Sequence, residues 1–372
     1  MIQHPSGIVS AVAAALLLAP VPGALAVPAT PALVDLGPGT VEAVNTAGDI
    51  AGYSGSSLVL WRHGTYERID LGVGGTWGPV GLNEHADVVG HLSDGPAFRW
   101  HDGVLTPLAH PTGDPAWAAA INDSGLVAGF RGAPDDLAPD RPFVWRDGVF
   151  TDVGPWHGLT AGEAVDVNDR GQVLINMYDA GRSAEHALLW DRGRLTDLGN
   201  LGSEHTTGTA LNDHGAVIGM GIDATGAYHP FQWQHGRMTD LWPAAAQSEA
   251  VANAINTAGD VVGYVIGAAG VQPVRWRHGV AGFLMPDRYG VATAVNDRGD
   301  VAGITFDPTR PDIVRVPFRW RHGRVTGYDV LEPALAGNWV SGIDGRGRVI
   351  GTSVVRGGMD HVVVWTAGQP AS

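Results

Sequence analysis

Short apolar runs alternate with glycine-containing turns along the whole chain. Runs such as DVVG (87–90), LVAG (126–129) and RVIG (348–351) each follow an Asn or Asp at the head of a turn. The spacing of these turn residues varies from 38 residues between the first two to 48 between the last two, so the period is about 42 residues. Such a period indicates a repeat protein. The turn residues are Asn45, Asn83, Asn122, Asn168, Asn212, Asn256, Asn296 and Asp344.

A Trp-x-x-Gly segment occurs once in each repeat and predicts a tight hairpin. We assign four short strands to each repeat. The first ends at the Asn, the second is the apolar run, the third ends at the Trp, and the fourth resembles RLTDLG (194–199). Four antiparallel strands in a repeat of this length are typical of a β-propeller blade. The Trp residues are Trp61, Trp100, Trp145, Trp190, Trp233, Trp276, Trp320 and Trp365.

The two ends of the sequence complement each other. The last repeat stops without a fourth strand, whereas ALVDLG (32–37) has the fourth-strand pattern and no preceding partners. Joining them would close a ring and remove an exposed sheet edge. We therefore predict an all-β, eight-bladed β-propeller in which the N-terminal strand closes the last blade. A seven-bladed propeller or an open β-repeat array is the alternative.

The repeat resembles a known family. Segments such as EHALLW (185–190), YHPFQW (228–233) and GPAFRW (95–100) precede Trp-x-x-Gly and an Asp-Leu-Gly-like strand, and the combination resembles the HAF repeats of bacterial proteins. The resemblance extends over nearly all of residues 32 to 368. It implies an extracellular, β-rich repeat protein, and it supplies no catalytic residues.

The composition limits which classes of partner and which cellular compartment we expect for this protein. The net charge is −15 and all 23 basic residues are Arg, which argues against nucleic acid as a partner. Residues 1–26 resemble a signal peptide, with the apolar run IVSAVAAALLLA (8–19) and Ala24-Leu25-Ala26 before the cleavage point. We therefore expect a secreted protein, with residues 27–372 as one propeller domain. We also expect a monomer without an integral membrane segment, and the absence of Cys excludes disulfides.

The repeated polar residues favour structural roles. NTAGD (45–49) and NDRGD (296–300) suggest calcium loops, but other copies such as NDHGA (212–216) lack the carboxylates that calcium needs, so turn capping is the preferred interpretation. The His of WRHG (61–64, 276–279 and 320–323) is replaced in other repeats and is expected to be solvated. No metal or cofactor is expected.

Candidate ligand-binding residues lie in the connections between repeats. Five Trp fall outside the repeat positions, all between the fourth strand of one repeat and the first strand of the next. In a propeller these connections share a face with the long loops at 131–140 and 305–313, and variable loops on a rigid scaffold commonly carry function. The alternative is that these Trp fill gaps between blades. The candidates are Trp77, Trp117, Trp156, Trp242 and Trp339, with His110, His157, Glu163 and His205 as polar neighbours.

Familiar catalytic motifs are missing from the sequence. GYSGS (52–56) is not Gly-x-Ser-x-Gly, and EHADVVGH (84–91) is not His-Glu-x-x-His. We therefore expect a non-enzymatic binding or interaction scaffold that recognises a carbohydrate, peptide or small ligand on the loop-rich face. The alternative is a carbohydrate-active hydrolase or lyase that uses the same face, and no catalytic residue is assigned.

Overall fold

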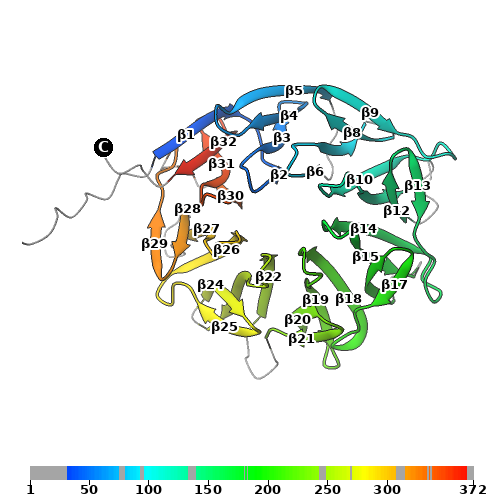
Figure 1. The fold of residues 1–372 in the computed structure, drawn as a ribbon. Coiled ribbons are helices and arrows are strands. Elements are labelled where there is room, and N and C mark those ends of the chain that lie inside the picture. The colour runs from blue at the N-terminus through cyan, green and yellow to red at the C-terminus, as the bar shows by residue number, and fades with distance from the viewer. Residues whose placement is uncertain are drawn as a thin grey trace, which may run out of the picture.

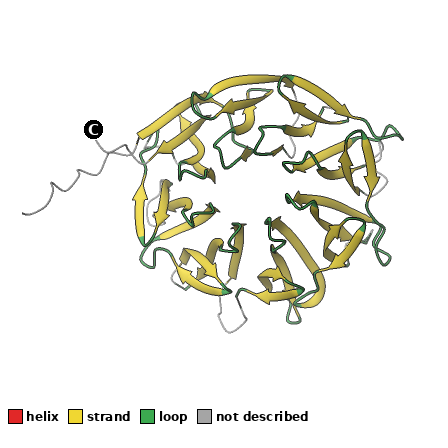
Figure 2. Ribbon diagram, in the orientation of Figure 1, coloured by secondary structure: helices red, strands yellow, loops and turns green. Residues whose placement is uncertain are grey.

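The chain is an all-β protein, as predicted. The computed structural model describes residues 32–74, 80–92, 96–132, 140–179, 181, 183–242, 249–268, 270–306, 315–332, 335 and 337–366. Within these ranges there are 32 strands and no helix, hence no helix able to cross a membrane (Figure 2). The signal-peptide prediction (1–26) and Trp77 lie outside the described residues.

Four-stranded antiparallel units follow one another along the chain. The first four units comprise β2 (Ala43–Val44), β3 (Ile50–Ser54), β4 (Ser57–Arg62) and β5 (Glu67–Gly74); β6 (Gly81–Leu82), β7 (Val88–His91), β8 (Ala97–His101) and β9 (Val104–Leu108); β10 (Ala116–Ile121), β11 (Val127–Arg131), β12 (Arg141–Arg146) and β13 (Val149–Asp152); and β14 (Ala161–Val167), β15 (Gln172–Tyr178), β16 (Glu185–Asp191) and β17 (Arg194–Asp197).

The remaining units have the same strand order, and the last of them takes its fourth strand from the N-terminal side of the chain. They comprise β18 (Gly202–Leu211), β19 (Val217–Asp223), β20 (Tyr228–Gln234) and β21 (Arg237–Asp240); β22 (Glu249–Ile255), β23 (Val261–Gly267), β24 (Gly270–Arg277) and β25 (Val280–Phe283); β26 (Tyr289–Val295), β27 (Val301–Phe306), β28 (Val316–Arg321) and β29 (Arg324–Gly327); and β30 (Asn338–Ile343), β31 (Val349–Val355), β32 (Met359–Thr366) and β1 (Ala32–Pro38).

The units are arranged as a β-propeller, in a ring around a central axis (Figure 1). The first strands of neighbouring units contact one another around the inside of the ring, as β10 does with β6 and β14, and β26 with β22 and β30. The fourth and fifth units also share one parallel bridge, between Glu185 and His205. Apolar side chains from adjacent units fill the space between sheets.

The repeated Asn residues cap their own turns and also connect the units. In the first unit, Asn45 Oδ1 accepts the backbone N–H of Gly48 at 2.9 Å and of Asp49 at 2.8 Å, which confirms turn capping. Its Nδ2 also donates to the main-chain oxygen of Asn83 in the next unit at 3.0 Å. The same link between units is made by Asn83, Asn122, Asn168, Asn212, Asn256 and Asn296.

At Asp344, which has no amide to donate, Arg348 makes the corresponding connection. Arg348 pairs with Asp344 and donates to the main-chain oxygen of Ala47 in the first unit at 3.1 Å. The backbone N–H of Gly345 also donates to Thr46 O at 2.8 Å. The last unit is therefore hydrogen-bonded to the first.

The Trp-x-x-Gly hairpins have the backbone that their sequence predicts. In the hairpins of the second to seventh units the two central turn residues have positive φ, for example 49° at Arg192 and 90° at Gly193, as a type I′ turn requires, whereas in the first unit Gly64 has positive φ and His63 does not. The side chains of His235, His278 and His322 are exposed at this position, as expected. His63 differs, because its Nδ1 lies 2.7 Å from Asp49 Oδ1.

The His of the HAF-like segment has a structural role in the third strand. The Nδ1 atoms of His186 and His229 lie 3.1 and 2.9 Å from the carboxylates of Asp197 and Asp240 in the adjacent fourth strands. The Nδ1 of His361 lies 3.0 Å from Asp35 in the same way, although 326 residues separate them. Thus Asp35 of β1 contacts the His of β32 in the way that Asp197 and Asp240 contact the His of their own units. Leu33 of β1 also pairs with Trp365 of β32 in the antiparallel ladder.

Candidate functional site

Trp117 and Trp339 begin the innermost strands of two different units. Trp117 is half-buried, and its ring stacks on Phe130 with a centroid distance of 5.4 Å and an interplanar angle of 14°. Trp339 is 47% exposed, and the Arg315 guanidinium lies 3.9 Å from its ring centroid. Each Trp therefore has a local aromatic or cationic partner, and the two do not contact one another.

Trp156 and Trp242 pack against the core. Trp156 contacts the cluster between the third and fourth units, and its ring lies 4.5 Å from that of His157 and 5.4 Å from that of His186. Trp242 packs on the cluster that contains Trp276. Both Trp are half-buried, which agrees with the gap-filling alternative.

The polar candidates are held by separate neighbours and do not form one cluster. His110 Nδ1 lies 2.6 Å from Thr112 Oγ1, and its Nε2 lies 3.6 Å from Asp152. Glu163 lies half-buried in β14, His205 lies half-buried in β18, and His157 is exposed at a φ of 47°. Among the described residues, no group of three or more His, Asp or Glu is arranged to hold a metal ion.

An ion-pair network stabilises the loop-rich face beside His110. Arg131 donates to Asp152 through Nε at 2.9 Å and Nη2 at 2.8 Å, and its Nη1 lies 2.5 Å from Asp114. The hydrogen bonds from Arg131 lower the pKa of Asp152 and outweigh the opposing effect of burial. Since Arg131 is engaged by both carboxylates, we interpret this network as structural.

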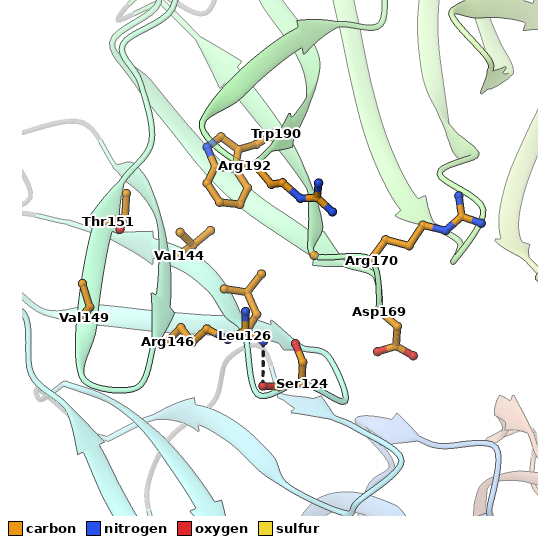
Figure 3. A pocket seen from close by; sticks show the side chains of 11 residues that line it. Ser124, Leu126, Val144, Arg146, Val149, Thr151, Asp169, Arg170, Trp190 and Arg192 are labelled. Carbon is orange, nitrogen blue, oxygen red and sulfur yellow. Dashed lines mark hydrogen bonds between the residues drawn. The ribbon is translucent and has the colours of Figure 1, made fainter.

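A cavity of about 470 Å³ lies between the third and fourth units, on the face that carries the Asn turns and the Trp-x-x-Gly hairpins (Figure 3). Leu126, Val144, Val149 and Trp190 give it an apolar lining. In Figure 3, Trp190 and Arg192 lie on one side, Ser124 and Arg146 on the opposite side, and Asp169 and Arg170 toward a third. Thr151 and Gly171 complete the lining.

Two residues of this lining differ from their counterparts in the second unit. Leu126 and Val144 stand in the third unit where the second has the ion pair of Asp87 and Arg99, with an N···O distance of 2.7 Å. At seven junctions a side chain lies beside the turn glycine of the next unit, and at this junction that side chain is Leu126 rather than Val144. The pairs are Arg99 with Gly125, Leu126 with Gly171, Gln172 with Gly215, Gln232 with Gly259, Arg275 with Gly299, Arg319 with Gly347 and Arg348 with Gly48.

The same departures leave Arg146 without a buried carboxylate. In the sixth and seventh units the residue after the Trp lies beside a buried Asp, with N···O distances of 2.8 Å for Arg277 and Asp260 and 3.3 Å for Arg321 and Asp300. Leu126 occupies that Asp position in the third unit. Arg146 instead donates to the main-chain oxygen of Ser124 at 3.2 Å.

The cavity therefore has an excess of positive charge. Arg146, Arg170 and Arg192 line it together with one carboxylate, Asp169. One oxygen of Asp169 already accepts the backbone N–H of Asp123 at 2.9 Å. Burial raises the pKa of Asp169, and the nearby Asp123 and Asp213 carboxylates raise it further. An anionic group beside an apolar group is the chemistry that this lining fits.

The sequence pattern points to the opposite face, so this site is not among the predicted ones. The available signal was a mismatch within the repeat. Four turns carry Asp four residues after the Asn, at Asp49, Asp87, Asp260 and Asp300, whereas the third carries Leu126. Three repeats place Arg before the Trp, at Arg99, Arg275 and Arg319, whereas the third has Val144.

A second departure, in the neighbouring unit, yields a pH-dependent prediction. Asp166 stands in β14 where other first strands carry Ala or Gly, and burial raises its pKa to about 6 even though its oxygens accept the N–H groups of Val167 and Leu211. Its ionised form therefore costs stability once the pH rises from about 4 through 6. We expect Asp166→Asn to raise the free energy of unfolding at pH 8 by about 1 to 3 kcal/mol.

At pH 4 the same variant should show only a small gain, because the carboxyl group is then neutral in the folded state and only about half ionised in the unfolded state. Urea unfolding at the two pH values measures the difference. Asp287→Asn, at an exposed position, makes the same change in charge and is the control. An equal effect of Asp166→Asn at pH 4 and pH 8 would contradict the prediction.

Comparisons with known proteins give the fold class. No protein-family model and no curated protein matches this chain. A puromycin-hydrolyzing peptidase of Mycobacterium tuberculosis is similar in structure, with 15% identity, a TM-score of 0.50, and coverage of 87% of this chain and 58% of that one. A structure from a study of two prolyl endopeptidases matches with 10% identity, a TM-score of 0.56, and coverage of 87% and 55%. The β-propeller domain of the Trilobed protease from Pyrococcus furiosus aligns over 91% of this chain and 97% of its own, with 10% identity and a TM-score of 0.45.

These similarities correct the functional prediction. The expected non-enzymatic scaffold is wrong, because the similar structures belong to peptidases, which are enzymes. At 10 to 15% identity the likeness itself establishes only the propeller fold. The chain spans a little more than half the length of the two larger peptidase chains.

Proposed function

We propose that this chain takes part in peptide hydrolysis, as the propeller that binds the peptide substrate of a peptidase. The observation that carries the proposal is the structural likeness to peptidases over 87% of this chain. The chain corresponds to 55 to 58% of the length of those proteins, and we assign to its propeller the binding of the peptide that is hydrolysed.

The cavity between the third and fourth units supports a peptide as the bound substrate. Its volume of about 470 Å³ lies in the range of small-ligand sites and can hold the end of a peptide chain. Arg side chains around an apolar lining match the mixed polar and apolar character of peptides. Ser124 and Thr151 add polar groups at its edge.

We also infer an eight-bladed propeller closed by β1. Three observations support this inference: the pairing of β1 with β32, the contact of Asp35 with His361, and the hydrogen bond from Arg348 to Ala47 between the last and first units. A closed ring would hold the junction between the third and fourth units rigid, which favours a preformed binding cavity.

The test uses a variant that carries, in the third unit, the pair of residues found at the same positions of the second unit. The double substitution Leu126→Asp with Val144→Arg copies the pair found at Asp87 and Arg99, so it should fill the cavity and leave the fold intact. The wild-type chain and this variant, each tagged, are isolated from cells that naturally make the protein. Peptide hydrolysis in the two eluates is then measured by mass spectrometry.

We expect peptide-hydrolysing activity in the wild-type eluate and about a 10-fold lower rate with the filled variant, because substrate would lose a charged and apolar binding site. Circular dichroism checks that both chains are equally folded. An eluate that hydrolyses no more peptide than one from untagged cells would contradict the proposed function.

A further inference from the structure

We infer that the cavity between the third and fourth units binds the C-terminal carboxylate of a peptide whose last side chain is apolar. This inference rests on the proposed function and specifies which part of the peptide is recognised. It follows from the placement of Arg146, Arg170 and Arg192 around the apolar surface of Leu126, Val144 and Trp190.

The Arg side chains provide the carboxylate recognition. A guanidinium group offers paired N–H donors that fit the two oxygens of a carboxylate. Arg170 makes no side-chain hydrogen bond or ion pair with the residues that the structure describes. Arg192 is 3.8 Å from Asp191, with both side chains largely exposed, so this pair competes weakly with a ligand.

The position of Arg146 points to the same ligand. Its counterparts Arg277 and Arg321 are engaged by Asp260 and Asp300 of their own turns, whereas Arg146 has Leu126 at the equivalent place. A carboxylate of a ligand can supply the negative charge that Asp260 and Asp300 supply in the sixth and seventh units. The missing Asp of the third unit thus marks where the peptide's carboxylate would enter.

The apolar lining favours a terminal residue with an aliphatic or aromatic side chain. Leu126 and Val144 belong to the buried core, and Trp190 is half-buried against the same cluster. In the seventh unit the Arg275 guanidinium lies 4.6 Å from the ring centroid of the equivalent Trp320, whereas Val144 stands at the Arg275 position in the third unit. An apolar side chain of a ligand that packs on Trp190 would be removed from water.

Isothermal titration calorimetry with paired peptides tests the inference. One peptide is acetyl-Gly-Ala-Leu with a free carboxylate, and its partner is the same peptide with a C-terminal amide. We expect the acid to bind about 10-fold more tightly or better, because a charged hydrogen-bond acceptor is lost in the amide. A third peptide that ends in Gly should also bind more weakly than the one that ends in Leu.

Variants locate the binding. Arg146→Gln and Arg192→Gln should each weaken binding of the acid and leave that of the amide nearly unchanged. Arg194→Gln, on the same hairpin as Arg192 and outside the cavity lining, is the matched control and should leave both unchanged. The filled variant, Leu126→Asp with Val144→Arg, should abolish binding of both.

The outcomes separate this inference from the proposed function. If the acid and the amide bind equally, or if the filled variant binds as the wild type does, the inference of a carboxylate site in this cavity is wrong. The proposed role in peptide hydrolysis is then unaffected, because the eluate assay tests it separately. If 3-phenylpropionate or inorganic phosphate binds more tightly than the peptide acid, the site is not one for peptide ends. If no peptide binds and the eluate assay shows no hydrolysis, both proposals fail.

Discussion

Replacement of Trp365 by Ala is expected to lower the free energy of unfolding by about 3 to 5 kcal/mol. The Trp365 side chain is fully buried, and its Nε1–H donates to the main-chain oxygen of Asp329 at 2.7 Å. It packs in a core cluster with Val340 and Val363, and Leu33 of β1 packs on the same cluster. Truncation would leave a large cavity and an unpaired carbonyl group beside the paired strands β1 and β32.

Trp190→Ala is the matched control, because Trp190 occupies the same repeat position but borders the cavity. Its ring is half-buried and lines the cavity, so we expect a loss of about 1 to 2 kcal/mol. Urea unfolding followed by far-ultraviolet circular dichroism measures both variants. Equal losses would contradict the view that the third and fourth units are less densely packed than the last unit.

The repeat made most of the fold predictable from the sequence. Asn or Asp at each first turn and Trp-x-x-Gly at the hairpins of the second to seventh units specify positive-φ turns and hence the strand boundaries. A fourth-strand pattern at residues 32–37, without partners of its own, indicated the pairing with β32. These features are local, so a single sequence contains them.

The links between units could not be predicted in this way. The Nδ2 of Asn122 donates to the main-chain oxygen of Asn168, 46 residues away, and nothing in a turn sequence distinguishes this bond from simple capping. Likewise, the pairing of His186 with Asp197 depends on the register between neighbouring strands. Both contacts require coordinates.

The cavity was missed for a different physical reason. Loop length and the Trp residues outside the repeat positions indicated the loop-rich face, whereas this cavity is lined by residues of strands and turns on the other face. Leu126 and Val144 are unremarkable as core residues, and their significance emerges only by comparison with Asp87 and Arg99 at the same repeat positions. Departures from a repeat are thus as informative as the insertions between its strands.

Removal of β1 is the second large effect that we expect. A chain without residues 2–38 would lose the outer strand of the last unit and leave the edge of β32 unpaired. Leu33 and Leu36 pack against the two core clusters on either side of this sheet, so their loss should lower the free energy of unfolding by about 3 kcal/mol or more. The exposed edge should also cause association at high protein concentration.

A chain without residues 2–30 retains β1 and is the control for this deletion, with unchanged stability expected. A synthetic peptide of residues 30–40, added to the shorter chain, should pair with β32 and raise the melting temperature in a concentration-dependent manner. The same peptide with Leu33→Asp should fail, because a charge would be buried beside Trp365. Unchanged stability after loss of residues 2–38 would show that β1 does not hold the ring closed. Rescue by the unmodified peptide, but not by the Leu33→Asp peptide, would show that the pairing with β32 and the apolar contacts of β1 hold the ring closed.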